Sequence, residues 1–210
     1  MIRALVFDWG GVIQRTEEPA PRQALEAELG LAPGGLDRAV FGSDVWALAS
    51  TGRCSVVAAW SQIVASVGFD GGVRAFVERF FAGDRLDPRL LDLIRRCRSE
   101  GYRLALLSNA PPPLESGRTV LARWGDPSLF DVQVFSYQVG VLKPDAAMYR
   151  AVLSALGSPA EGALFIDDSP ANVAGALRVG MQAVHFAGTD ALLHRFCLLG
   201  LPLVHQDTIR

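Results

Sequence analysis

Short apolar runs that end in a polar residue recur along the chain, and each of them predicts a strand. They are residues 3–8 (RALVFD), 103–109 (RLALLSN) and 163–168 (ALFIDD), with shorter candidates at 132–135 (VQVF) and 182–186 (QAVHF). The apolar residues are largely continuous rather than alternating, which is typical of strands buried on both faces of a parallel sheet. The pattern therefore predicts a parallel sheet inside the molecule.

Helical periodicity fills the intervals between these runs. Residues 87–101 have Asp87 as a predicted N-cap, Pro88 at the first helical position and Gly101 as the stop. Residues 144–157 and 170–180 follow the same pattern. Strands and helices thus alternate from about residue 86 onward, which predicts a doubly wound α/β domain.

Residues from about 15 to 85 have a different pattern. They hold helical periodicity at 21–30, 55–68 and 72–83, and no convincing strand. An insertion directly after the first strand is expected above the carboxyl end of that strand, where ligands bind in open α/β sheets. We therefore expect an α/β core of residues 1–14 plus 86–210, and a helical cap of residues 15–85 above the site.

Composition removes some classes of partner. The 210 residues carry a net charge of −2, which gives no reason to expect nucleic acid or an anionic membrane surface as a partner. No apolar run approaches the length of a membrane span, and Met1 leads directly into a predicted strand. A cytoplasmic location is the expectation.

The thiols and imidazoles offer no metal-binding pattern. The three cysteines are far apart, and we expect reduced thiols; the three histidines lack ligand spacing, and we expect packing or surface roles. These residues are Cys54, Cys97, Cys197, His185, His194 and His205.

Polar residues gather instead at one edge of the predicted sheet. Taken singly, each is explained as a helix cap or a turn residue. Together they bring three carboxylates, a hydroxyl and the only lysine of the chain to one cleft, and three ionised carboxylates share a small site only with a cation. Oxygen ligands with access to water favour Mg²⁺. The residues are Asp8, Ser108, Asn109, Lys143, Asp167 and Asp168.

Four segments carry a family resemblance, in the family's order and from end to end of the chain. FDWGGV, LLSNA, GVLKPDAAMY and LFIDDSPANVAGALRVGM resemble the four motifs of the haloacid dehalogenase superfamily hydrolases that have a small helical cap after the first strand. The cap size and the first motif are similar to those of sugar-phosphate phosphatases and of the phosphatase domain of soluble epoxide hydrolases. The resemblance implies a phosphatase that acts through an aspartyl-phosphate on a small phosphorylated metabolite, as a monomer or homodimer.

The resemblance also implies a role for each residue. Asp8 is expected to be the nucleophile. Ser108, Asn109 and Lys143 are expected to bind the substrate phosphate, with Lys143 also helping to keep Asp8 ionised.

The expected metal is Mg²⁺. Its ligands are expected to be Asp8, the carbonyl oxygen of Gly10 and Asp168, with Asp167 either a further ligand or a partner of the ligands. Gly10 is also a departure from the family, because most of its phosphatases have an aspartate there that protonates the leaving oxygen. General acid–base assistance of this kind is typically worth about 10²–10⁴-fold in rate.

Alternatives to a phosphatase remain. The pocket of a protein that binds phosphate or metabolites with little or no turnover would look similar, although simple binding does not need Asp8. A metal-free 2-haloacid dehalogenase would use Asp8 but would not need the Asp167–Asp168 pair. A phosphonate hydrolase would need a lysine in the cap. Within the cap, Trp46 and Arg53 are candidates for facing the site, although a helix aromatic is more often part of the core.

Overall fold

The computed structural model describes residues 1–114 and 127–201, and a five-stranded sheet lies at its centre. The strand order is β5-β4-β1-β6-β7, and every neighbouring pair is parallel. The strands are β1 (Ala4–Phe7), β4 (Arg103–Ser108), β5 (Val132–Phe135), β6 (Ala163–Asp167) and β7 (Gln182–His185). The five predicted strands and the doubly wound α/β class are confirmed. The chain order reverses at β1, and this reversal creates the crevice in which such sheets bind ligands.

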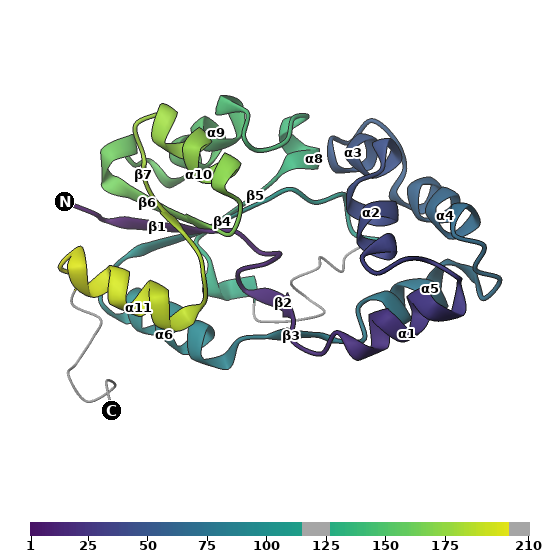
Figure 1. The fold of residues 1–210 in the computed structure, drawn as a ribbon. Coiled ribbons are helices and arrows are strands. Elements are labelled where there is room, and N and C mark those ends of the chain that lie inside the picture. Colours follow the sequence, from purple (N-terminus) through teal and green to yellow (C-terminus); the bar gives the residue numbers. More distant parts are fainter. Residues whose placement is uncertain (115–126, 202–210) are drawn as a thin grey trace.

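Helices cover both faces of the sheet (Figure 1). On one face lie α6 (Pro88–Ser99) and α11 (Thr189–Leu198), and on the other α9 (Ala146–Leu156) and α10 (Pro170–Arg178). Strand β1 is apolar throughout because both of its faces are buried. Leu5 and Phe7 pack into the hydrophobic cluster on the first face of the sheet, and Ala4 and Val6 pack into the cluster on the second. Short helical turns, α8 (Ser136–Val139), η1 (Pro127–Leu129) and η2 (Ala160–Gly162), adjoin these elements.

The predicted helix starts agree closely with the structure. Asp87 caps α6 by accepting hydrogen bonds from the backbone N–H groups of Arg89 and Leu90, as predicted. Helix α9 begins slightly later than predicted, because Asp145 is its N-cap and its side chain accepts a hydrogen bond from the N–H of Ala147.

Five helices form a separate group beside the sheet, at the right in Figure 1. They are α1 (Ala20–Glu28), α2 (Gly35–Phe41), α3 (Asp44–Ser50), α4 (Val56–Ser66) and α5 (Gly72–Phe80). A third hydrophobic cluster packs within this group, with Leu25, Ile63 and Phe76 almost completely buried. We call these helices the cap; the division into core residues 1–14 plus 86–210 and cap residues 15–85 stays a prediction.

The expectation of no strand between residues 15 and 85 was wrong. Strand β2 (Gln14–Thr16) pairs antiparallel with β3 (Asp84–Leu86), and the two connect the sheet to the cap helices. Each strand has only three residues, too few to show a periodicity. Polar side chains stabilise the pairing, because the Asp84 carboxylate accepts hydrogen bonds from the side chains of Gln14 and Thr16.

The described residues also show the character of the helices and the state of the thiols. None of their helices combines the length and the apolar character needed to cross a membrane. The three cysteines are free thiols, and burial raises the pKa of Cys97 to about 12, which keeps that thiol protonated.

Candidate active site

The predicted polar residues meet beyond the carboxyl ends of the strands. Asp8 follows β1, Ser108 ends β4 and Asp167 ends β6, and the parallel pairing of β1 with both neighbours brings these ends together. One cavity of about 1000 Å³ opens here between sheet and cap. Of the predicted site residues, it is lined by Asp8, Gly10, Ser108, Asn109, Lys143 and Asp168, whereas Asp167 lies behind the lining and is fully buried.

Lys143 is the fixed centre of the cluster. Its Nζ lies 2.8 Å from Asp8 Oδ1 and 2.7 Å from Asp167 Oδ2, and it donates a hydrogen bond of 3.0 Å to the Leu107 carbonyl oxygen. These three acceptors match the three hydrogens of an ammonium group. Asn109 holds the backbone of the same lysine: its Oδ1 accepts from the Lys143 N–H at 2.8 Å, and its Nδ2 donates to the Lys143 carbonyl oxygen at 3.1 Å. The side chain of Asn109 therefore positions Lys143.

Asp8 is buried at the mouth of the crevice. Burial raises its pKa to about 7, the ammonium of Lys143 opposes the rise, and the charge of Asp167 adds to it. The N–H of Trp9 donates a 2.7 Å hydrogen bond to Asp8 Oδ1, the same oxygen that faces Lys143. The carboxylate is thus held in one orientation, and a further positive charge nearby would favour its ionised form.

The two aspartates after β6 have different surroundings. Asp167 Oδ1 accepts hydrogen bonds from the N–H of Ser169 and from Asn172 Nδ2, and Oδ2 accepts from Lys143 and again from Asn172 Nδ2. Each oxygen of Asp167 thereby has two donors, which occupy its lone pairs. Asp168 is solvent-exposed, although partial burial of its carboxyl, together with the charge of Asp167, raises its pKa. Asp168 rather than Asp167 has oxygens free for a ligand.

A glycine makes room for Asp168. A Cβ at Gly11 would lie 2.0 Å from Asp168 Oδ2, and Gly11 has φ +80°, which side chains rarely allow. Gly10 has no such constraint, because its φ is not positive and a Cβ there would meet nothing within 4 Å. The first glycine of the pair is therefore open to substitution, and the second is not.

The carboxylates fit a hard divalent cation. Oxygen atoms of Asp8, Asp167 and Asp168 lie within 4.8 Å of one another. When all three carboxylates are ionised, the single ammonium of Lys143 leaves two of their negative charges uncompensated, and an oxygen-only set of this kind suits Mg²⁺. His185 contributes no ligand atom to this group; its Nε2 lies 2.9 Å from the Asp168 carbonyl oxygen, and His205 lies outside the described residues.

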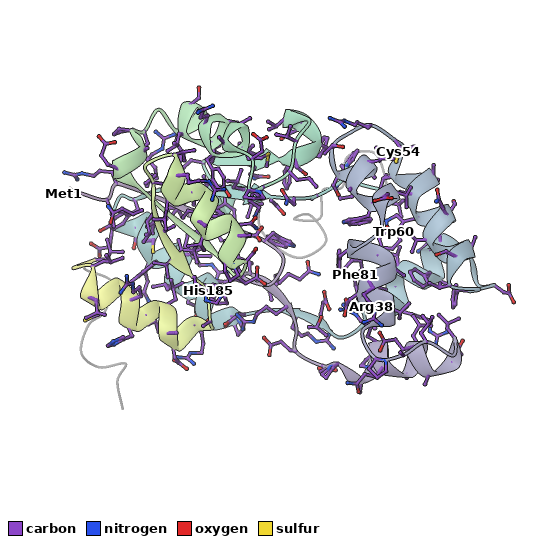
Figure 2. The ribbon with its side chains drawn as sticks, turned by 45° about the horizontal axis from the view of Figure 1, so that its top comes forward. Met1, Arg38, Cys54, Trp60, Phe81 and His185 are labelled. Atoms are coloured by element: carbon purple, nitrogen blue, oxygen red, sulfur yellow. The ribbon has the colours of Figure 1, made fainter. Side chains whose placement is uncertain are left out.

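The cap supplies the other wall of the cavity. Of the two cap residues that the sequence made candidates for facing the site, Trp46 lines the cavity and Arg53 does not. Trp46 belongs to a row of ring contacts that we call the aromatic wall, with centroid separations of 5.8, 5.0 and 6.3 Å along Phe41–Trp46–Trp60–Phe81. Figure 2 shows Trp60 and Phe81 among the cap helices.

Sequence reasoning missed four of the residues that shape the site. Three of them are aromatic residues in helical patterns, and such a pattern does not distinguish a ring in the hydrophobic core from a ring that lines a cavity: Phe41, Trp60 and Phe81. Trp60 in fact belongs to both groups, because it is 3% exposed, packs in the core of the cap and lines the cavity. Asn172 lies within the fourth motif, five residues after Asp167, and that spacing at a helix start was the available signal.

Comparison with known proteins agrees with this geometry. The family model described as haloacid dehalogenase-like hydrolase matches residues 2–180. The chain belongs to this family. The resemblance seen in the four motifs is thereby confirmed, and with it the assignment to the hydrolases.

Relatives of the chain carry phosphatase names. It is 28% identical over 192 residues to the sesquiterpene phosphatase astK of Aspergillus oryzae, covering 90% of this chain and 91% of astK. It is 32% identical over 197 residues to a phosphoglycolate phosphatase of Rhodospirillum rubrum, covering 88% of this chain and 79% of that one. Among solved structures, the HAD family enzyme bt-2542 of Bacteroides thetaiotaomicron, in complex with magnesium and inorganic phosphate, superposes with a TM-score of 0.70 at 20% identity. That superposition covers 90% of this chain and 97% of the other.

Proposed function

We propose that this protein is a Mg²⁺-dependent phosphomonoester hydrolase in which Asp8 is the nucleophile. The observation that carries the proposal is the buried contact of Asp8 with Lys143, which Asp167 and Asn109 hold in place from behind. A carboxylate fixed beside an ammonium at the opening of a cavity is suited to attack a phosphoryl group. The phosphatase names of the two relatives support the same reaction class.

The reaction has two displacements at phosphorus. A carboxylate oxygen of Asp8 attacks the phosphorus, and the bond to the substrate's alcohol oxygen breaks with its electron pair going to that oxygen. Water then attacks the phosphorus of the aspartyl-phosphate, which releases inorganic phosphate and restores the carboxylate. We expect the hydroxyl of Ser108, which lines the cavity beside Asp8, to bind a nonbridging phosphoryl oxygen. Lys143 would bind another by exchanging its contact with Asp8 Oδ1 for one with the phosphoryl group.

We assign the metal ligands as Asp8, the carbonyl oxygen of Gly10 and Asp168. When bound, Mg²⁺ would neutralise negative charge on the phosphoryl oxygens. Asp167, whose oxygens are occupied by hydrogen bonds, acts instead by positioning Lys143. A small phosphorylated metabolite is the corresponding substrate.

Gly10 favours a second candidate, a protein that binds phosphate or metabolites with weak or no turnover. A glycine supplies no proton to the leaving oxygen, and lack of general acid assistance costs about 10²–10⁴-fold in rate. Chemistry without metal is less well supported, because a 2-haloacid dehalogenase has no use for the Asp168 carboxylate that lies against Gly11.

Phosphate release from an aryl phosphate tests the proposal. We expect turnover that requires Mg²⁺ and stops in EDTA. Asp8→Asn removes the nucleophile and should reduce the rate to background, and Asp168→Asn should weaken Mg²⁺ affinity so that activity recovers in part at high Mg²⁺. Asp92→Asn, on the exposed face of α6, is the matched control and should match the wild type.

Other outcomes select an alternative. Full turnover in EDTA together with halide release from a 2-haloacid would identify a dehalogenase. Calorimetric binding of Mg²⁺ and phosphate without release of phosphate from any ester would identify a binding protein.

A further inference from the structure

The cavity continues from the carboxylates far into the cap, where its walls are apolar. We propose that the alcohol part of the substrate is a long hydrocarbon group, so that the phosphate lies at Asp8 and the chain lies along the aromatic wall. This inference rests on the proposed phosphatase activity and specifies its substrate class as phosphate monoesters of apolar alcohols.

The aromatic wall is the first support. Its rings touch one another in a row from α2 to the end of α5, and all four line the cavity. Phe41 is 52% exposed, an unusual state for a ring in contact with Trp46 and Phe80. A hydrocarbon chain lying here would remove apolar surface of the wall from water without bringing in hydroxyl groups that need hydrogen-bond partners, as a sugar would. Further apolar lining comes from Val56, Val77, Leu114 and the prolines 111–113.

The charged lining residues between positions 15 and 84 are the second support, because each already has an ion-pair partner. Arg22 bridges Asp37 at 2.7 Å and Asp84 at 2.9 Å. Arg74 pairs with Glu78 at 3.1 Å on α5. A sugar or another polyol is recognised through hydrogen-bonding groups that are free to turn to it. Arg22 and Asp84, the buried charged pair of this wall, are held by each other.

Arg15 completes this pattern. It pairs with Asp87 at 2.8 Å and with Glu17 at 2.9 Å. The neutral polar residues beside it are likewise engaged, since Gln14 and Thr16 both donate to Asp84. The polar groups of the cap end thus form an internal network, and the surface left for a ligand is mainly hydrocarbon.

Size is the third support. A volume of about 1000 Å³ lies at the upper end of the range for small-molecule sites. A short hydrophilic phosphate ester would occupy only the part beside Asp8 and would leave the aromatic wall in contact with water. A chain long enough to reach the wall would gain from each methylene that it buries.

Binding of n-alkylphosphonates to the wild-type protein in Mg²⁺ tests the inference without turnover. The probes run from methyl- to dodecylphosphonate, each below its micelle concentration, and affinity is measured by calorimetry. We expect the affinity to rise about two- to fourfold per methylene until the cavity is filled. Affinity independent of chain length, or tighter binding of a polyhydroxylated phosphonate of equal length, would overturn the inference.

The same preparation is assayed with an aryl phosphate, so that the two proposals fail separately. Turnover of the aryl phosphate together with phosphonate affinity that does not depend on chain length would contradict the hydrocarbon substrate and would support the phosphatase activity. Length-dependent phosphonate binding without turnover of aryl or alkyl phosphates would support the apolar site and contradict the phosphatase.

Two exposed apolar residues of the cap provide matched variants. Phe41→Ser removes a ring of the aromatic wall, and Leu48→Ser removes a side chain that is 43% exposed but does not line the cavity. We expect Phe41→Ser, and Trp46→Ala beside it, to weaken long-chain binding about tenfold while methylphosphonate binding is unchanged. Leu48→Ser should bind both probes like the wild type. If both wall variants keep the wild-type preference for long chains, the chain does not lie on the wall and the proposal is wrong.

Discussion

Gly10 and Gly11 are adjacent but meet different structural demands. Gly11 combines a φ of +80° with close contact to Asp168, so that its missing side chain is a requirement of the fold. Gly10 lines the cavity with neither constraint, so that the fold does not require a glycine there and a side chain at this position would change only the groups available in the cavity. A carboxylate side chain can therefore be introduced at Gly10 without a steric clash at its Cβ.

We predict that Gly10→Asp raises the turnover of alkyl phosphates relative to aryl phosphates. An alkoxide leaves poorly without a proton, whereas a phenolate leaves readily, so the wild type should prefer aryl esters strongly. The substitution should raise alkyl turnover by up to about 10²-fold. The measurement is the ratio of alkyl to aryl phosphate turnover, compared between the wild type and the Gly10→Asp variant. A wild type indifferent to the leaving group, with a ratio unmoved by the substitution, would mean that another group donates the proton.

The neighbouring position is the control for this experiment. Gly11→Ala should lower Mg²⁺ affinity and stability together, because its Cβ displaces the Asp168 carboxylate. The two variants differ by one position in the chain, and only the first should gain activity.

At the scale of elements, helix α6 is attached at its first turn. Asp87 caps the helix and also accepts hydrogen bonds from Arg15 and from the Thr189 hydroxyl, so that it ties α6 to β2 and to the start of α11. Burial raises the pKa of Asp87, but the hydrogen bonds from Thr189, Arg15 and Leu90 outweigh it and hold the pKa below its usual value. The ionised form is therefore the one that the fold stabilises.

We predict that Asp87→Asn lowers the free energy of unfolding by about 1 kcal/mol at pH 7, because asparagine caps the helix but carries no charge for Arg15. The lowered pKa makes this contribution full above the usual aspartate pKa of about 4, and it is lost as the pH falls through the folded value. Urea unfolding at pH 7 and under acid conditions measures the difference, which should shrink in acid. Asp190→Asn, at an exposed ion pair with Arg89, should change little at either pH; a difference at Asp87 that is constant with pH would contradict the prediction.

Elements differ in how far the sequence predicts them. The sheet strands are predictable because burial on both faces leaves them apolar throughout, as Val6 and Phe7 illustrate at 0% exposure. The β2–β3 pair is not, because it depends on Asp84, whose partners Gln14 and Thr16 lie about seventy positions earlier in the chain. Site residues at strand ends follow from the parallel sheet, whereas Trp60 and Phe81 required knowledge of how the cap helices pack.

At the scale of the whole molecule, one run of hydrogen bonds connects the loop after β1, which carries Asp8, to the cap. Trp9 Nε1 donates to Gln14 Oε1 at 2.7 Å, and Gln14 Nε2 donates to Asp84 Oδ2 at 2.8 Å. Asp84 Oδ1 in turn accepts from Arg22 on α1 at 2.9 Å. Since the backbone N–H of Trp9 also donates a hydrogen bond to Asp8, the position of the cap and the position of the Asp8 carboxylate depend on the same few side chains.

We predict that Asp84→Ala lowers the free energy of unfolding by about 2–3 kcal/mol, because Gln14 and Arg22 lose the buried carboxylate to which they donate hydrogen bonds. The KM for a long-chain ester should rise as the cap loses its alignment with the sheet. Urea unfolding and steady-state kinetics give the two quantities. Asp92→Asn, at an exposed pair with Arg95, serves as the reference, and an Asp84→Ala protein as stable as that reference would refute the prediction.

The burial of Lys143 has a consequence for chemical labelling. It is the only lysine of the chain, it is 4% exposed, and its amine lies between Asp8 and Asp167. Reagents that acylate lysine side chains, as used to attach a dye or a solid support, therefore find no exposed lysine in this chain and should leave the Lys143 amine unmodified.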